Sequence, residues 1–417
     1  MPAASDTGSD PKAALSDLLV QSGKSGSGEV LIAGGGIGGL AAALALAKRG
    51  IACHVLERRA AFSEQGAGIQ IGPNGTRILR DLGVAEALRP HAGAPQWLIV
   101  HEAARGRELA RLPLNAGMES RFGSPYWVVH REDLHAALLM QVRAAAKVRI
   151  SMDADIVHAA SNDAAAGVAL RNGDCLAGAV LVGADGLRSQ VRAAIGEAGD
   201  LVPVGKSAFR AVVPASEVDP QLLDGGTHIW LARNAHVVHY TLRGGTEVAI
   251  VLIVDDAFAG EGWSHEADPR SVLAKLGFAA LLRETLSAAT GWRKWALVGL
   301  ETAPRMASGR IALLGDAAHP VMPFLAQGGV LALEDAVVLA QVLASGERTT
   351  PDALQAYERL RRPRAQRIAG ASRRNGRIYH LGGLAAVARN ASLRLVPGQR
   401  LMAGYDWIYG WTGGPPK

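Results

Sequence analysis

The sequence predicts a mixed α/β fold: a parallel-sheet domain built from discontinuous segments, an antiparallel sheet inserted into it, and a long C-terminal helix. Two apolar runs, 30–33 and 310–314, have the composition of buried parallel strands, and each precedes a turn and a helical segment. Residues 209–254 instead contain four strand-like runs separated by glycine-containing turns, which is typical of antiparallel sheets. Residues 352–380 form a long basic stretch of helical composition.

The composition is that of a globular protein from a reducing compartment. The chain has 417 residues, well above the ~150-residue prior for one domain, so we expect two or three structural units. Its two cysteines, Cys53 and Cys175, cannot form a disulfide framework, which favours a cytoplasmic location. The net charge of +6 is spread along the chain, whereas a nucleic-acid-binding protein would concentrate it, so we expect no nucleic acid partner.

The first 28 residues are rich in Ser, Gly and Asp. They lack the charged and apolar regions of a secretory signal, and we predict a disordered N-terminal segment over 1–28. The uncharged run 30–47 is nearly as long as a membrane-spanning helix, but five glycines between residues 34 and 39 interrupt it. We therefore expect a strand, a turn and a helix there, and no association with a membrane.

The first ordered unit has the pattern of a βαβ unit. Residues 30–33 are the first strand, 34–39 the turn, 40–49 an alanine- and leucine-rich helix, and 52–57 the second strand. Three further strands and one helix are expected before the inserted sheet, at 97–102, 126–130 and 179–184 for the strands and 131–146 for the helix.

The inserted antiparallel sheet is expected to contain four strands, at residues 209–213, 228–231, 236–242 and 247–254. The chain then returns to a buried strand at 310–314 and a helix from 328 to 344. These boundaries assign 29–200 and 301–345 to one discontinuous domain, 201–300 to the inserted domain, and 346–417 to a C-terminal helical segment and tail.

A nucleotide site is indicated by the turn between the first strand and the first helix. Gly34, Gly36 and Gly39 fit the G-x-G-x-x-G pattern, whose glycines permit a tight turn, the approach of a pyrophosphate and close helix–strand packing. The helix N-terminus offers free N–H groups to the phosphates. Glu57, 18 residues after Gly39 and at the end of the second strand, is placed to accept hydrogen bonds from ribose hydroxyls.

A second, distant segment indicates a flavin. Asp316 follows the strand at 310–314 and can bond a polyol, and Gly328 and Gly329 begin the next helix. Free N–H groups at that helix N-terminus would stabilise a group that becomes anionic, as reduced flavin does at N1 and C2=O. We therefore expect FAD as the resident cofactor.

Four segments in this order resemble the class A, single-component FAD-dependent aromatic hydroxylases, most closely the branch of salicylate hydroxylases and 3-hydroxybenzoate 6-hydroxylases. The segments are Gly34–Gly39, His130–Leu134, Gly183–Ser189 and Gly315–Ala336. The resemblance implies a Rossmann-like FAD-binding domain with an inserted substrate domain. It also implies a cofactor site that includes Arg58, Arg131, Asp185 and Asp316, with Arg131 near the pyrophosphate or ribityl region and Asp316 on the ribityl chain.

The reaction implied by the resemblance has two parts. NADH or NADPH binds transiently and reduces FAD, and O2 then gives a flavin C4a-hydroperoxide that hydroxylates a small aromatic acid or phenol. Two departures from the branch, at Leu300–Met306 and at Gly329-Val330, border the pocket and leave the substrate open. The alternatives are a hydroxylase of an N-heteroaromatic or purine on the same scaffold, and a flavin-binding reductase or sensor without oxygenase activity.

A catalytic base is expected on the strand at 236–242. Side chains alternate along a strand, so His236 and Tyr240 share one face while His239 lies on the other. The branch that this chain resembles has its active-site His and a substrate-contacting Tyr at these positions, and a phenol becomes more nucleophilic when a base removes its proton. We therefore predict His236 and Tyr240 as catalytic residues, with Pro323 in the wall of the substrate pocket.

Other candidates stay outside the predicted site. Arg210 and Arg243 could bind a substrate carboxylate through a bidentate fork, but we interpret each as a surface or cofactor-side charge. The histidines and cysteines show no zinc-like spacing, so we expect no metal site. The choice between a monomer and a homodimer stays open, because the aromatic tail at 407–411 could pack within the chain or on a partner subunit.

Overall fold

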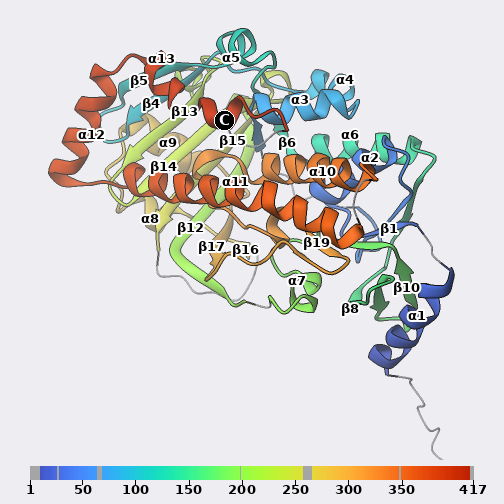
Figure 1. Cartoon of the computed structure of the whole chain (residues 1–417). Coiled ribbons are helices and arrows are strands. Elements are labelled where there is room, and N and C mark those ends of the chain that lie inside the picture. Colours follow the sequence, from blue (N-terminus) through green and yellow to red (C-terminus); the bar gives the residue numbers. More distant parts are fainter. Residues whose placement is uncertain are drawn as a thin grey trace, which may run out of the picture.

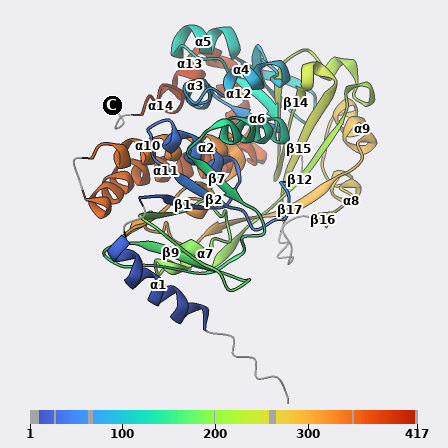
Figure 2. The same ribbon diagram turned by 90° about the vertical axis from the view of Figure 1, so that its right-hand side faces the viewer.

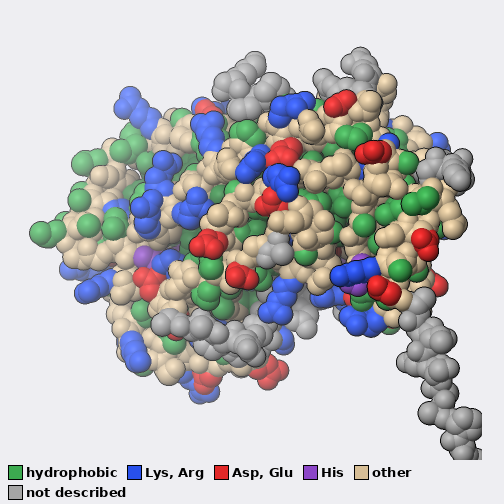
Figure 3. Space-filling model, turned by 60° about the horizontal axis from the view of Figure 1, so that its bottom comes forward, with side chains coloured by type: hydrophobic (Ala, Val, Ile, Leu, Met, Phe, Trp, Pro, Cys, Tyr) green, Lys and Arg blue, Asp and Glu red, His purple; other side chains and the backbone are tan. Residues whose placement is uncertain are grey.

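The computed structural model describes residues 10–25, 28–62, 68–197, 199–256, 265–346 and 349–413. They form two main sheets, with helices packed over the parallel one and the long helix α11 running past both (Figure 1). On the face shown in Figure 3, basic and acidic side chains are interspersed. None of the described helices is both long enough and apolar enough to cross a membrane.

The first sheet is the predicted parallel sheet. Within the described residues it has six strands, β18 (Ala307–Ser308), β19 (Ile311–Leu313), β11 (Val180–Gly183), β1 (Val30–Ala33), β2 (Cys53–Leu56) and β7 (Val148–Ser151), in that order. All neighbours pair in parallel except β18, which is antiparallel to β19. Helices α2 (Ile37–Ala47) and α10 (Gly328–Ala344) pack on each other beside it, so segments from both ends of the chain share one core.

The second sheet has eight strands among the described residues. In order they are β16 (His265–Glu266), β17 (Arg293–Leu300), β12 (Leu201–Pro214), β15 (Glu247–Asp255), β14 (Ala235–Leu242), β13 (Thr227–Ala232), β4 (Trp97–Glu102) and β5 (Arg107–Pro113). The four strands expected in this domain are β12 to β15. The structure differs from the expected boundary at β4 and β5, which come from the segment 29–200. β4 pairs in parallel with β13, and its own residues carry no signal of which sheet it joins.

Helix α1 (Pro11–Ser25) lies where we expected a disordered segment. It packs on a three-stranded sheet of β8 (Ile156–Ser161), β9 (Ala166–Leu170) and β10 (Cys175–Gly178), at the edge of the molecule (Figure 2). Leu15 and Leu19, one turn apart, are 2% and 4% exposed. A side chain at Gly167 would meet both leucines at 3.1 and 3.2 Å, so this glycine lets the helix approach the strand. Two buried leucines within a polar stretch therefore decide the structure of this segment.

The C-terminal segment is helical, as expected. It comprises α11 (Thr350–Tyr379), α12 (Gly383–Leu395), α13 (Gly398–Ala403) and α14 (Asp406–Tyr409). The tail packs within the chain, because the Trp411 ring lies 5.1 Å from the Arg361 guanidinium and 5.2 Å from that of Arg364. The other strands and longer helices are β3 (Gly68–Ile71), β6 (Trp127–His130), α3 (Pro73–Asp81), α4 (Ala85–Leu88), α5 (Asn115–Phe122), α6 (Arg131–Ala144), α7 (Gln190–Ala194), α8 (Arg270–Leu273) and α9 (Ala280–Ala288).

A buried ionic network fixes α11 to the loop after β19. Arg361 donates to Asp335 at 2.7 Å and to Glu334 at 2.9 Å, and all three side chains are at most 1% exposed. Asp335 also accepts hydrogen bonds from the Gly315 backbone N–H and from His319. Asp335 therefore bonds Gly315 and His319, the residues on either side of Asp316 in this turn.

Candidate cofactor site and substrate cavity

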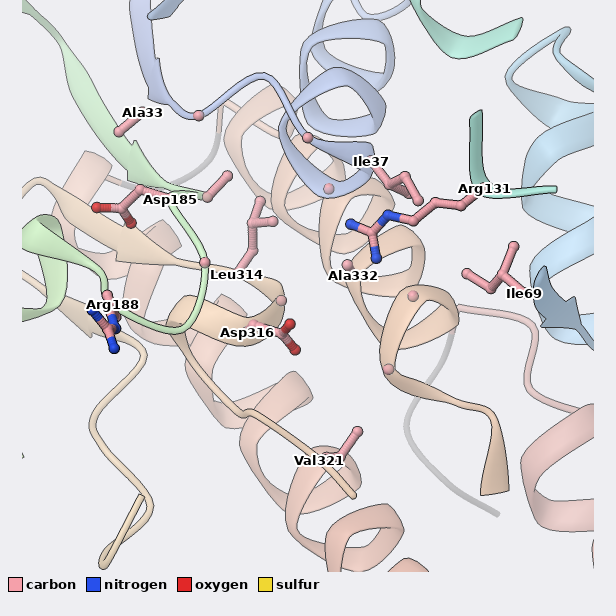
Figure 4. Close-up of a pocket in the computed structure, with 18 of the residues that line it drawn as sticks. Ala33, Ile37, Ile69, Arg131, Asp185, Arg188, Leu314, Asp316, Val321 and Ala332 are labelled. Atoms are coloured by element: carbon pink, nitrogen blue, oxygen red, sulfur yellow. The ribbon is translucent and has the colours of Figure 1, made fainter. Parts of the chain in front are cut away.

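A cavity of about 930 Å³ lies between the carboxyl ends of the parallel strands and one face of the antiparallel sheet. The site residues proposed from the sequence line it, with the exception of Gly39: Gly34, Gly36, Glu57, Arg58, Arg131, Asp185, Asp316, Gly328, Gly329, Pro323, His236 and Tyr240. Figure 4 shows part of this wall, with Arg131 and Asp316 pointing into the same space. The fold thus brings together residues from six separate stretches of the chain.

The glycine turn has the geometry that its pattern requires. Gly34 adopts φ +100°, and a side chain there would lie 2.6 Å from the Ala184 carbonyl oxygen. A side chain at Gly39 would lie 1.9 Å from the Gly34 carbonyl oxygen, so only glycine lets α2 pack on the turn. Gly36 has open space in front of it, where the cavity lies. Gly34 and Gly39 therefore shape the turn, and Gly36 leaves room for a ligand.

Glu57 stands at the end of β2 as an ionised acceptor. Its carboxylate accepts the Gly35 backbone N–H at 2.9 Å and the Arg59 backbone N–H and Nε at 3.1 and 2.8 Å. Burial opposes ionisation of this carboxyl, but the hydrogen bonds with Arg59 and Gly35 outweigh it and hold the pKa of Glu57 below its usual value. The side chain is 4% exposed and fixed at the cavity wall.

Two aspartates present acceptor atoms deeper in the cavity. Asp185 uses Oδ2 to accept the backbone N–H groups of Gln190 and Val191, whereas its buried Oδ1 has no hydrogen-bond partner among the described residues. Burial raises the pKa of Asp185, and the same cause raises that of Asp316, where Arg131 and His319 partly oppose it. An acceptor left without a donor is suited to the hydroxyl groups of a bound ligand.

Helix α10 points its N-terminus into the cavity. Gly328 and Gly329 are its first residues and line the wall, and the preceding Gln327 places no side chain on the first N–H groups. The helix has 17 residues, so its first turn offers unpaired N–H donors and a partial positive charge. These donors suit a ring system that gains negative charge on reduction.

The floor of the cavity is one face of the antiparallel sheet. His236, Val238 and Tyr240 of β14 all line it, together with Val251 and Ile253 of β15. The next paired strand adds Arg210, since Val238 lies opposite Val251 and Val251 lies opposite Arg210. His239 points to the other side, where its ring stacks on that of His228 at 4.4 Å. The predicted alternation of faces is therefore the one observed.

His236 and Tyr240 are held in defined positions. His236 is 1% exposed, and its Nδ1 lies 2.8 Å from Nε2 of His380. Burial, together with His380 and Lys206, holds the pKa of His236 well below its ordinary value, so the imidazole is neutral at pH 7. Burial raises the pKa of Tyr240, which stays protonated, and Gln70 hydrogen-bonds to its hydroxyl. The pair thus combines a neutral base with a phenolic donor.

The pocket wall also comes from the loop after Asp316. Val321 and Pro323 line the cavity, and the neighbouring Phe324 ring lies 5.5 Å from that of His236. Pro323 thus lines the same cavity as the predicted base, and the residue that follows it, Phe324, contacts the His236 ring.

Arg210, which the sequence analysis considered for a substrate carboxylate but left outside the predicted site, lies at the cavity. Its side chain lines the cavity, its guanidinium lies 5.3 Å from the Trp295 ring, and its buried Nε has no hydrogen-bond partner among the described residues. Burial lowers the pKa of Arg210. The sequence feature that indicates a position in the cavity is that this Arg lies within an otherwise apolar stretch of β12. Arg243 lies elsewhere, in ion pairs with Asp133 and Glu247 at 3.1 Å each.

The residues present fit FAD. The glycine turn, the α2 N-terminus and Glu57 together suit an adenosine diphosphate. Asp185, next to Gly34, adds an oxygen without a hydrogen-bond partner among the described residues, which suits a ligand hydroxyl. Asp316 and the α10 N-terminus suit a ribityl chain and a flavin ring.

Comparisons with known proteins agree with this fit. The FAD binding domain family matches residues 27–372. The chain is 35% identical over 387 residues to 3-hydroxybenzoate 6-hydroxylase of Polaromonas naphthalenivorans, covering 92% of this chain and 96% of that protein. It is 34% identical over 392 residues to 3-amino-4-hydroxybenzoate 2-monooxygenase PtnB3 of Streptomyces platensis, covering 93% and 96%.

The chain is also similar to a protein whose structure was solved with FAD bound. Klebsiella pneumoniae HpxO complexed with FAD and uric acid matches with a TM-score of 0.80 and 25% identity, covering 90% of this chain and 95% of that chain. The expected FAD cofactor and class of enzyme are confirmed, and the reductase and sensor alternatives are not favoured. The chain belongs to the FAD binding domain family, and within it to the FAD-dependent monooxygenases that hydroxylate aromatic compounds.

Proposed function

We propose that the protein hydroxylates a small phenol that carries a carboxylate, using NADH or NADPH and O2. The observation that supports this most directly is the sheet floor of the cavity, where the neutral His236 and the protonated Tyr240 lie on the same face as the half-buried Arg210. The first two are suited to a phenol hydroxyl. A guanidinium whose buried Nε has no hydrogen-bond partner among the described residues is suited to an anion.

Bound FAD supplies the oxidation–reduction chemistry with the nicotinamide cofactor and O2. In our proposal Gly34, Gly36, Glu57 and Arg58 hold its adenosine diphosphate end, with Gly39 shaping the turn. Arg131, Asp185 and Asp316 hold the phosphates and ribityl chain. Gly328 and Gly329, at the N-terminus of α10, would offer N–H groups to the flavin ring as it gains negative charge. Each of these residues except Gly39 lines the cavity.

The substrate-side roles follow from the protonation states. His236 accepts the phenol proton at Nε2, since Nδ1 is already engaged with His380. Tyr240, oriented by Gln70, donates a hydrogen bond to the oxygen that becomes negative. The apolar side chains of Val238, Val251 and Pro323 reduce access of water to the reacting ring.

The relatives agree with a substrate of this kind. The names 3-hydroxybenzoate 6-hydroxylase and 3-amino-4-hydroxybenzoate 2-monooxygenase both describe a phenol that carries a carboxylate. Hydroxybenzoates combine the two groups that His236 and Arg210 would recognise.

The experiment compares substrates that carry both a hydroxyl and a carboxylate with compounds that lack one of these two groups. Purified holoenzyme is given NADH or NADPH and, in turn, hydroxybenzoates, benzoate without a hydroxyl, phenol without a carboxylate, hydroxypyridines and urate. Reductant oxidation and hydroxylated product are both quantified. We expect a hydroxybenzoate to give product in proportion to reductant consumed, with phenol and benzoate much poorer. Preference for urate or a hydroxypyridine over every hydroxybenzoate would contradict the proposed substrate class.

Location and oligomeric state are part of the same proposal. We place the enzyme in the cytoplasm, where nicotinamide cofactors are available and thiols such as the free Cys53 and Cys175 stay reduced. We propose a monomer or a homodimer, which sedimentation of the holoenzyme distinguishes.

A further inference from the structure

The cavity and the surface are joined by a chain of hydrogen bonds that the proposed role of His236 does not by itself require. Nδ1 of His236 lies 2.8 Å from Nε2 of His380, and Nδ1 of His380 lies 2.7 Å from Oδ1 of Asp255. His380 is 7% exposed, whereas the Asp255 side chain is 39% exposed. The chain therefore begins at a buried base and ends at a carboxylate in contact with water.

The two ends lie in different cavities. His236 lines the cavity of the proposed flavin and substrate site. Asp255 lines a second cavity of about 810 Å³, bordered by Asn234, Leu381 and Arg389. A proton that leaves the first cavity along this chain would thus reach the second one without passing the flavin site.

We propose that His236, His380 and Asp255 form a relay that carries the substrate's hydroxyl proton out of the closed pocket to the second cavity. This inference rests on the proposed function, in which the substrate is a phenol and His236 is its base. His380 and Asp255 do not touch the substrate, so they act as positioning and relay residues.

The relay has a defined starting arrangement. Nδ1 of His380 faces both Oδ1 of Asp255 at 2.7 Å and the Lys206 ammonium at 3.1 Å. In the proposed relay Nδ1 carries the proton and donates it to the carboxylate, which only accepts, while Lys206 donates to Asp255 and not to this nitrogen. Nε2 of His380 then accepts from Nδ1–H of His236. Nε2 of His236 is then unprotonated on the side of the substrate. Lys206 contributes by forming an ion pair with Asp255, which keeps the carboxylate ionised and oriented.

The proton transfers balance in three steps. The substrate O–H bond breaks as an N–H bond forms at Nε2 of His236. The Nδ1–H bond of His236 breaks as one forms at Nε2 of His380. The Nδ1–H bond of His380 breaks, and the proton passes to the Asp255 carboxylate and from there to water.

The charged groups around the relay keep both imidazoles neutral. His380 is faced by Lys206 from β12, Asp255 from β15, His236 from β14 and Arg389 from α12. Burial and Lys206 lower the pKa of His380 more than Asp255 raises it, and the pKa of His236 is lowered as well. Neutral rings with one N–H each are the forms that can both accept and donate a proton.

The backbone holds the relay in register. The Asn234 N–H donates to the His380 carbonyl at 3.1 Å, and the Asp255 N–H donates to the Asn234 carbonyl at 2.8 Å. The Arg389 guanidinium bonds the carbonyls of Ile378 and Tyr379, just before His380. The loop after α11 is therefore fixed to the β13–β14 turn and the end of β15.

The test compares His380→Gln and Asp255→Asn with Asp256→Asn. Asp256 is the neighbouring carboxylate in the second cavity, but it pairs with Lys294 and Ser207 and does not bond His380. Single-turnover hydroxylation is measured from pH 6 to 9 with a hydroxybenzoate that the wild-type enzyme accepts, alongside FAD content and substrate Kd.

We expect His380→Gln to slow hydroxylation at pH 7 by roughly 10-fold or more, a part of the usual contribution of acid–base catalysis. The rate of this variant should rise with pH, because solvent base must then take the proton. Asp255→Asn should show the same trend more weakly, and Asp256→Asn should match wild type. FAD content and Kd should stay within about twofold of wild type in every variant.

Two further variants separate the relay from the base and from simple misfolding. In the His236→Ala variant, the additional change His380→Gln should not lower the hydroxylation rate further, because the relay begins at His236. In His380→Ala, added imidazole should restore part of the rate by replacing the missing ring.

The possible failures are distinguishable. If His236→Ala slows hydroxylation and His380→Gln does not, the relay is wrong and the proposed base stands. If His380→Gln is slow at every pH to the same degree and imidazole does not help, its role is structural and the relay is wrong. If wild type hydroxylates no phenol, the proposed function fails first.

Discussion

At the scale of single residues, the glycine turn shows how a missing side chain creates a binding site. Gly39 lies within α2, where a glycine normally lowers helix stability, yet its Cβ position is occupied by the Gly34 carbonyl oxygen. Close packing at this point sets the direction of the α2 N-terminus, which faces the cavity. Glycine at this position lowers the stability of the helix, but no larger residue fits beside the Gly34 carbonyl oxygen.

Gly39→Ala should therefore abolish FAD binding. The added methyl group would overlap a carbonyl oxygen 1.9 Å away, and neither backbone can move without opening the turn. The control is Gly370→Ala in α11, where no atom lies within 4 Å of the new Cβ. It should retain FAD and stabilise the helix by ~0.5–1 kcal/mol. Flavin absorbance after desalting and thermal unfolding measure both effects, and a yellow Gly39→Ala protein would contradict the expectation.

A second prediction at this scale concerns Arg210. Arg210→Gln should raise KM for a carboxylated phenol by roughly 10- to 100-fold, because hydrogen bonds to charged groups contribute ~1.5–3 kcal/mol. Turnover of a neutral phenol should change little. Arg210→Lys should recover part of the affinity through its charge, without the bidentate geometry.

The matched control for Arg210 is Arg243→Gln, which removes an Arg that is paired with Asp133 outside the cavity. Steady-state kinetics of the three variants with both substrates measure the effect. An equal increase in KM for neutral and carboxylated phenols would show that Arg210 does not bind the carboxylate.

At the scale of elements, the contact between α10 and α11 keeps the Asp316 turn in place. Asp335 of α10 bonds both Arg361 of α11 and the Gly315 N–H, so the two helices and the turn move as one unit. Arg364 adds a two-point contact with Glu334 at 2.6 Å. Helix α11 therefore supports the cofactor site although none of its residues, 350–379, lines the cavity.

Asp335→Asn tests this contact through its pH dependence. Arg361 and His319 hold the pKa of Asp335 down at about 2 despite its burial. A carboxyl with a depressed pKa adds stability above its unfolded pKa of ~4, and this stability is lost as the pH falls from ~4 toward 2. The variant should unfold more easily at pH 7, by ~3–5 kcal/mol, because the buried Arg361 and His319 lose the carboxylate that they share and Glu334 remains opposite Arg361.

The acid-dependent loss of stability between pH 4 and pH 2 should also become shallower in Asp335→Asn. The control is Glu108→Gln, whose carboxylate pairs with Arg111 and is 42% exposed, so it should cost no more than ~1 kcal/mol. Urea unfolding at a series of pH values measures both. Equal stability of the two variants at pH 7 would mean that the network does not support the fold.

At the scale of the whole molecule, helix α1 covers a sheet at the edge of the nucleotide-binding half, away from the substrate floor (Figure 2). Among residues 11–22, the part of the helix whose side chains the structure describes, Leu15 and Leu19 are the two that are buried against that sheet. The helix is therefore an addition to the fold whose attachment depends on two side chains.

Replacing both leucines by Asp should release α1 without loss of FAD. Neither side chain lines the cavity, and buried charges cannot be accommodated beside Ala165 and Ala169. Proteolysis within residues 10–28 should accelerate. The control is Val20→Asp, at a position on the same helix that is 66% exposed and should change nothing. Unchanged protease resistance of the double variant would contradict the packing.

The features of this protein that depend on local periodicity and backbone chemistry can be predicted from the amino-acid sequence. These are the βαβ unit with its glycine turn, the acidic residue at the end of β2, and the shared face of His236 and Tyr240. Each follows from residues within about one element of each other, because strand alternation and turn geometry are short-range properties. Arg58, Arg131 and Asp185 were instead expected from the family resemblance, and with the residues predicted from local pattern they line one cavity, Gly39 excepted.

The contacts between distant segments are visible only in the folded protein. There β4 and β5 belong to the antiparallel sheet, and Leu15 and Leu19 attach α1 to the small sheet. Arg210 lines the cavity, and His380 lies against His236. Local pattern cannot reveal these contacts, because the same Arg or His has the same neighbours in sequence whether it faces water or a pocket. Burial and partners are set by packing between segments more than 100 residues apart, and that packing gives His380 its place beside the proposed base.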